Sequence, residues 1–177
     1  MIHKIGLVIF ACLLVACTPT GREDIATTGT LLRQAAFYKE QLQYLPALET
    51  YRQAIKQAEK EKDSTALSLA YLETGKIYRN QSLKPKALQS EKTALAYAEG
   101  TACDSLRIAL YREIADIYAL SGQTDSAFHY YQKAGCRIRQ AQILRQTGKQ
   151  KEAETILKTE LEQTRSQEEK AELYLAL

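Results

Sequence analysis

The stretch from Tyr71 to Ala94, YLETGKIYRNQSLKPKALQSEKTA, carries an arrangement of aromatic and small residues that recurs along the chain. Three of its residues have counterparts of the same type 40 residues earlier and 40 residues later. The matched sets are Tyr38, Ala47 and Ala54; Tyr78, Ala87 and Ala94; and Tyr118, Ala127 and Ala134. A period of this length indicates an array of repeated units. Chance recurrence in an alanine-rich helical protein is the alternative, and agreement at three positions in three copies argues against it.

Small residues at these places suit a pair of antiparallel helices, which need small side chains where their axes approach most closely. Gly75, Ala115 and Ala141 are assigned to first helices, and Ala47, Ala87, Ala127 and Ala153 to second helices. One helix pair cannot bury its apolar stripe alone, so neighbouring pairs must stack into a shared core. The pattern therefore predicts an all-α protein.

The order and spacing of Tyr71, Gly75, Tyr78, Ala87 and Ala94 resemble the tetratricopeptide repeat (TPR). The resemblance covers about Leu31 to Leu177 and implies an α-solenoid of antiparallel helix hairpins, with about four repeats plus a final helix. This chain departs from the family pattern in three ways. It has no tryptophan at the first large position, no proline at the end of each unit, and 40-residue instead of 34-residue spacing.

The helix boundaries follow from the apolar periodicity and from caps. We expect helices over residues 25–41, 44–62, 64–80, 85–99, 102–120, 124–134, 137–146, 150–164 and from 166 onward. Gly122 and Gly148 fall where a first helix should end with a left-handed residue, and Leu42 and Ser82 take that place in the other two repeats. Ala153 follows Ala127 by only 26 residues, so Gly135 must host a tight turn or a kink; its left-handed capping ability favours the turn.

The N-terminus indicates export. Lys4 precedes an apolar run of about 12 residues, which is too short to span a bilayer comfortably and is typical of a signal peptide. Leu14, Val15, Ala16 and Cys17 resemble the lipobox of bacterial lipoproteins, which implies cleavage before Cys17 and its acylation, for example with palmitate. An ordinary signal peptide with a coincidental cysteine is the alternative. We therefore divide the chain into a signal peptide (1–16), a flexible tether (17–28) and a TPR-like domain (29–177).

Composition limits the functions that the chain could have. It has 177 residues, 45% hydrophobic and 25% charged, which suits one globular or repeat domain. Loss of Lys4 with the signal peptide leaves 23 basic against 21 acidic residues, so bulk charge implies no nucleic-acid partner.

Residues that could carry chemistry are sparse. His129 is the only histidine left after processing, and no catalytic motif, metal-ligand set or cofactor motif accompanies it. We therefore expect no enzymatic activity, no metal site and no cofactor. Cys103 and Cys136 precede neighbouring first helices, so they are either bridged or free; packed helices lie about 8–10 Å apart, which favours free thiols.

The resemblance also implies a groove lined by first helices, in which such repeats bind protein segments. The matching positions are Lys39, Lys76, Arg79, Asn80, Arg112, Gln142 and Arg145, with Glu40 and Asp116 opposing them. A cationic groove favours an acidic segment or a free carboxylate as partner. An ordinary solvated helix face is the alternative.

Two functional hypotheses follow. The first is a lipid-anchored, non-enzymatic protein-binding scaffold of a bacterial cell envelope, held at the outer membrane on its periplasmic or surface face. The second is an extracytoplasmic sensory or regulatory input module of a longer membrane signalling protein. The apolar final helix, which ends at Leu177, motivates the second hypothesis and suggests a truncated chain.

Overall fold

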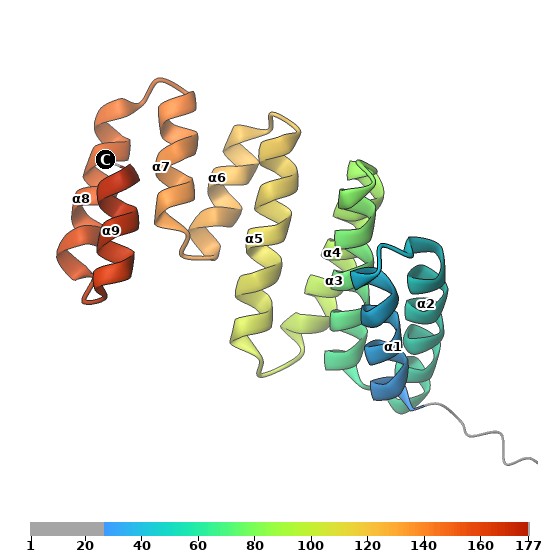
Figure 1. Cartoon of the computed structure of the whole chain (residues 1–177). Coiled ribbons are helices and arrows are strands. Elements are labelled where there is room, and N and C mark those ends of the chain that lie inside the picture. Colours follow the sequence, from blue (N-terminus) through green and yellow to red (C-terminus); the bar gives the residue numbers. More distant parts are fainter. Residues whose placement is uncertain (1–26, 177) are drawn as a thin grey trace, which may run out of the picture.

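The computed structural model describes residues 27–176, apart from the side chain of Glu169. The predicted signal peptide, the proposed acylation site Cys17 and most of the predicted tether lie outside the described residues. The described part is all-α, with nine helices in sequential hairpins (Figure 1). They are α1 (Thr28–Glu40), α2 (Tyr44–Glu61), α3 (Ser64–Asn80), α4 (Lys84–Glu99), α5 (Asp104–Leu120), α6 (Thr124–Lys133), α7 (Arg137–Gln146), α8 (Gln150–Gln163) and α9 (Gln167–Ala176).

Side chains and a proline mark several helix starts. Thr27 accepts a hydrogen bond from the backbone N–H of Thr30 at 3.3 Å, and Asp63 accepts one from the N–H of Ala66 at 2.9 Å. Both bonds satisfy donors that the first helical turn leaves without a partner. Pro85 occupies the first turn of α4, where its missing N–H costs no hydrogen bond.

The turn inside each of the four hairpins has one construction. Leu42, Ser82, Gly122 and Gly148 all have positive φ, between 57° and 80°. The residue after each of them donates its N–H to a carbonyl five residues back, as Gln43 does to Tyr38 at 2.9 Å. This bond satisfies a carbonyl at the helix end. The predicted left-handed glycines are confirmed, and the same backbone is imposed on a leucine and a serine.

The two helices of a hairpin approach closely at the predicted small residues. A Cβ at Gly75 would lie 3.3 Å from the carbonyl oxygen of Ala87, across the α3–α4 pair. Ala35 and Ala47 of the first hairpin are fully buried in one apolar cluster, and Ala115 and Ala127 share another. The expected contact between first and second helices is therefore confirmed.

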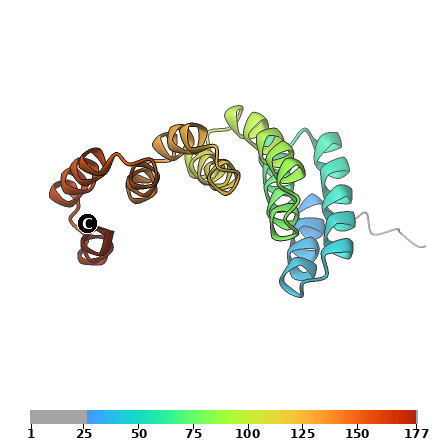
Figure 2. The same cartoon turned by 90° about the horizontal axis from the view of Figure 1, so that it is seen from above.

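Neighbouring hairpins stack through shared apolar clusters. Leu72 of α3, Ala94 of α4 and Leu110 of α5 belong to one buried cluster, which joins the second hairpin to the third. Gly135, with φ 69°, forms the turn between α6 and α7, so the predicted turn is confirmed and a kinked single helix is excluded. Seen from above, the hairpins follow one another in a curved row (Figure 2).

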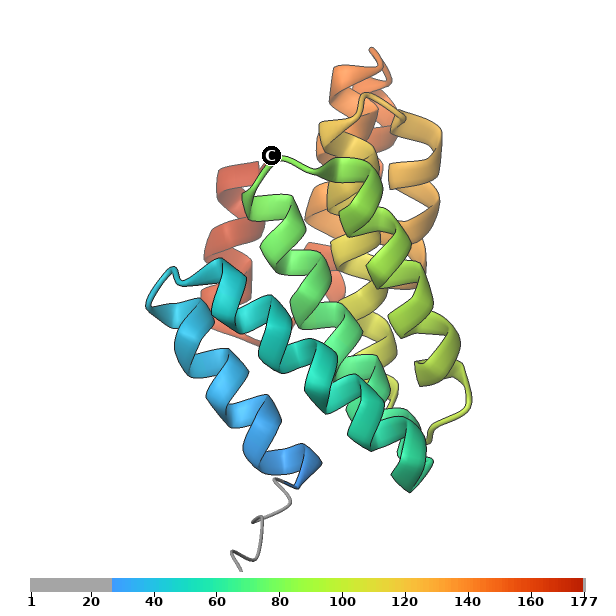
Figure 3. The same ribbon diagram turned by 90° about the vertical axis from the view of Figure 1, so that its right-hand side faces the viewer.

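The ends of the described chain differ in how they are covered. Figure 3 shows α1 and α2 as the outermost pair beside α3 and α4. At the other end, α9 packs on α7 and α8 through the buried Leu173, while Tyr174 and Leu175 are exposed. No helix among residues 27–176 is long and apolar enough to cross a membrane. Cys103 and Cys136 are free thiols.

Candidate partner-binding groove

Two adjoining cavities lie along first helices of successive hairpins, and we call them together the groove. The larger has a volume of about 710 Å³ and is bordered mainly by α7 and α9, with Arg112 of α5 and Glu160 of α8 at its edge. The smaller, about 440 Å³, lies between α3, α5, α6 and α7. Arg139 and Gln142 of α7 line both cavities, so the two form a continuous surface.

The larger cavity combines cationic and apolar walls. Arg112 reaches it from α5, and Arg137 and Arg139 from the start of α7. Apolar side chains line another part of it: Ile138, Leu173, Leu175 and Ala176. Two acids, Glu160 of α8 and Glu172 of α9, also border it. Arg137 Nε lies 3.6 Å from the Glu160 carboxylate, whereas no ion pair to Arg112 or Arg139 occurs among the described residues. The Arg139 guanidinium donates only to the neutral Gln142 side chain, at 3.2 Å, so both groups could still pair with a partner's carboxylate.

Arg79 of α3, Asp116 of α5 and Tyr131 of α6 lie in the wall of the smaller cavity and belong to one polar network. The Arg79 guanidinium forms an ion pair with Glu113, and its Nη1 lies 3.8 Å from Asp116 Oδ2. The Tyr131 hydroxyl of α6 donates to Asp116 Oδ1 at 2.5 Å. Burial, and then this hydrogen bond, raise the pKa of Tyr131, so the phenol remains a donor. This network ties the second hairpin to the third and uses the charge of Arg79 internally.

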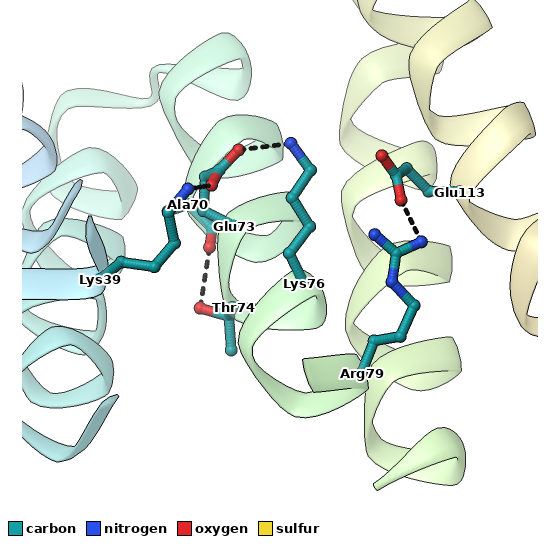
Figure 4. A network of polar contacts seen from close by, with 7 residues as sticks. All are labelled: Lys39, Ala70, Glu73, Thr74, Lys76, Arg79 and Glu113. Carbon is teal, nitrogen blue, oxygen red and sulfur yellow. Dashed lines mark hydrogen bonds and ion pairs between the residues drawn. The ribbon is translucent and has the colours of Figure 1, made fainter. Parts of the chain in front are cut away.

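The cations nearer the N-terminus are also engaged internally (Figure 4). Glu73 of α3 accepts hydrogen bonds from Lys39 of α1 and from Lys76, the latter at 2.7 Å. Burial would raise the pKa of Glu73, but the two lysines outweigh burial and hold the pKa below its usual value. Lys39 therefore joins the first hairpin to the second through the Glu73 carboxylate, which Lys76 shares from within α3.

A buried acid lies inside the second hairpin. Glu91 of α4 is completely buried, and neither of its carboxyl oxygens has a hydrogen-bond partner among the described residues. Burial, which disfavours the charged form, raises the pKa of Glu91 to about 8. Its nearest charged neighbours belong to α3 and α5, and they include Arg79 and Glu113.

Three of the seven residues predicted for the groove line its cavities, and four do not. Arg79 lines the smaller cavity, Arg112 the larger and Gln142 both; Lys39, Lys76, Asn80 and Arg145 line neither. Arg137 and Arg139 were missed because the predicted positions Gln142 and Arg145 lie in the second half of α7, whereas the first turn of that helix borders the larger cavity. The short spacing between Ala127 and Ala153 was the sequence feature that could have indicated this position, because the short α6 brings the start of α7 to the larger cavity.

Within residues 27–176, no group of three or more His, Cys, Asp and Glu side chains could hold a metal ion.

No protein-family model matches the chain, and no curated protein matches it. Solved structures do. Two crystal structures of nearly identical TPR-like repeats in a kinesin light chain candidate of Podosopora anserina superimpose with a TM-score of 0.64.

The sequence identity to these repeats is 17% for one structure and 18% for the other, which is of a variant of the same repeats. In each case 87% of this chain and 88% of the other chain are covered. The protein therefore has a TPR-like repeat fold, as the sequence predicted. This architecture is typical of non-catalytic scaffolds that present an extended surface to protein partners.

Proposed function

We propose that the protein is a non-enzymatic scaffold that binds a protein segment in the groove, chiefly in the cavity between α5, α7 and α9. The observation that supports this most strongly is the wall of that cavity, where Arg112 and Arg139 lack acidic partners among the described residues. The apolar side chains of Ile138 and Leu173 lie in the same wall. A segment that presents carboxylates beside large apolar side chains matches this surface.

The predicted cations of α1 and α3 contribute less to binding of an acidic partner. Lys39, Lys76 and Arg79 hold acids of their own chain, so a ligand carboxylate would have to compete with Glu73, Glu113 and Asp116. Replacing one carboxylate by another at such sites yields little net energy, whereas giving a carboxylate to a guanidinium that has no ion pair yields more. The partner's acidic residues should therefore lie over α5 and α7.

Peptide binding to the purified full chain tests this proposal. The probes are a fluorescent 12-residue peptide of alternating Asp and Leu, and a matched peptide of alternating Lys and Leu. We expect the acidic peptide to bind more tightly, with an affinity that falls as salt is raised, because screening weakens exposed charge pairs.

The matched variants carry equal changes in charge. The pair R112E and R139E should reduce binding of the acidic peptide by at least tenfold. The control pair K56E and K151E, in the exposed surfaces of α2 and α8, should change it little. If both pairs of substitutions reduced the affinity equally, or if the two peptides bound equally well, the proposed binding site would be refuted.

We also propose that the chain is anchored by a lipid on Cys17 in a bacterial envelope. The support is the sequence LVAC at residues 14–17, after an apolar run. More than one acyl chain is needed for lasting attachment to a bilayer. Labelled palmitate should enter the wild-type chain and not C17S, and mass spectrometry should find Cys17 as the first residue. Equal labelling of both chains would contradict the anchor.

A further inference from the structure

The second hairpin differs from the other three at two facing positions. The small residue of the first helix is alanine in three hairpins, at Ala35, Ala115 and Ala141, and glycine at Gly75. Each second helix has a small residue, which is alanine in all four hairpins. Four places after it stands Tyr51 in the first hairpin, Tyr131 in the third and Leu157 in the fourth, but Glu91 in the second. All four of these second-helix side chains are buried. Three hairpins thus place a large side chain with a mostly apolar body where the second places an ionisable one.

The two differences fit each other in space. A Cβ at Gly75 would lie 2.6 Å from Glu91 Cγ and 3.2 Å from Glu91 Oε1. A separation of 2.6 Å between two carbon atoms is a steric clash, so alanine at position 75 would force the Glu91 side chain to move. Gly75 therefore provides the room in which the Glu91 side chain is enclosed.

The charged groups that face Glu91 come from two helices. Lys76 and Arg79 belong to α3, in the same hairpin, and Glu113 and Asp116 belong to α5, in the next hairpin. The Arg79 guanidinium is already engaged with both acids of α5. A charged Glu91 would be repelled by these acids and would compete with them for Arg79, whereas a neutral Glu91 leaves the network as it stands.

The consequence concerns the attachment of one hairpin to the next. The ion pairs of Arg79 cross from α3 to α5, and the ring of Tyr118 on α5 lies 5.5 Å from Lys92 Nζ on α4. These polar contacts accompany the apolar cluster shared by α3, α4 and α5. A buried charge at Glu91 can be relieved by drawing Arg79 away from α5 or by admitting water between the hairpins, and either change loosens this joint.

We propose that the joint between the second and third hairpins is a proton-controlled hinge, in which protonated Glu91 holds α4 against α3 and α5 and loss of its proton releases α5. The proton moves from the Glu91 carboxyl group to solvent, and no other bond changes. The raised pKa of Glu91 agrees with this geometry, because it places the release just above neutral pH. The groove crosses this joint between Arg79 and Asp116, so its width there would follow the protonation of Glu91.

Pulsed electron paramagnetic resonance on the full chain tests the hinge. Keto-bearing unnatural residues at the exposed positions Gln89 of α4 and Gln132 of α6 accept spin labels without involving the native cysteines. We expect the distance distribution to broaden or shift to longer distances between pH 6 and pH 9. In E91Q it should remain at its pH 6 form throughout, because glutamine resembles the protonated acid and does not ionise.

Two further variants keep the test decisive. E99Q removes an exposed carboxylate from the same helix and should behave as the wild type. The double variant G75A/E91L gives the second hairpin the pattern of the fourth, so it should fold and show no pH response. An identical distribution at pH 6 and pH 9 in the wild type, or the same change in E91Q, would overturn the hinge.

Discussion

Replacing Glu91 by glutamine should make the protein more stable at neutral pH and should flatten its dependence on pH. The side chain is completely buried and its oxygens have no hydrogen-bond partner among the described residues, so glutamine gives up no bond. Burial raises the pKa of Glu91 in the folded chain from 4.5 to about 8. Well below pH 4.5 the Glu91 carboxyl group is protonated in both the folded and the unfolded chain, so its ionisation does not lower the free energy of unfolding.

The direction and size follow from proton linkage. Between pH 4.5 and 8 the unfolded chain releases the proton while the folded chain keeps it, so the free energy of unfolding falls as pH rises. Each pH unit corresponds to about 1.36 kcal/mol, which gives about 3 kcal/mol at pH 7 and about 4 kcal/mol at pH 8, where the folded chain has itself lost half of the proton. E91Q should escape this loss, and its advantage over the wild type should grow across that interval.

Urea unfolding followed by circular dichroism at pH 5, 6, 7 and 8 provides the assay. Other titrating groups are common to both chains, so the difference between them isolates Glu91. E99Q is the matched control, because its carboxylate is exposed on the same helix, and it should follow the wild type. Parallel curves for E91Q and the wild type would refute the reasoning.

Three further substitutions test individual contacts, each by urea unfolding. G75A should destabilise by about 1–3 kcal/mol, because its Cβ would overlap Glu91, and adding E91Q should not restore the loss whereas E91A should restore part of it. L42G should be neutral or stabilise by up to about 1 kcal/mol, because Leu42 is exposed and has φ 57°; a clear loss would contradict the strain argument. Y131F should cost about 1–2 kcal/mol by removing the donor to Asp116, and no change would show that water replaces the hydroxyl.

The architecture was predictable because close helix packing leaves a direct record in the sequence. The close approach of α3 and α4 requires small residues, which are Gly75 and Ala87. Two of the turns inside hairpins have a left-handed backbone that favours glycine, at Gly122 and Gly148. The predicted bounds of α3 and α7 match the structure, and the other helix ends lie within a few residues of prediction. The left-handed backbone at Leu42 and Ser82 could not be inferred from residue type, since hydrogen bonds at the helix end impose it.

The candidate site was less predictable, because charge in a sequence does not show which carboxylate a cation will face. Lys39, Lys76 and Arg79 were expected to face a partner. Lys39 and Arg79 engage acids of neighbouring helices, and Lys76 engages an acid of its own helix. The role of Arg139 depends on the short α6, which breaks the repeat register. Comparing Glu91 with Tyr51, Tyr131 and Leu157 was possible from the sequence alone and would have revealed the exceptional position. The binding role of the predicted residues remains a prediction.

The most direct measurement of the central proposal is the mapping of the acidic peptide on the isotope-labelled chain by nuclear magnetic resonance. We predict that the backbone signals of Arg112, Arg139 and Gln142 and the guanidinium signals of the two arginines shift first and most, with smaller shifts along α3. Shifts confined to α2 and α4, or none at peptide concentrations of about 1 mM, the weak end of specific binding, would contradict the proposal that this cavity receives the partner.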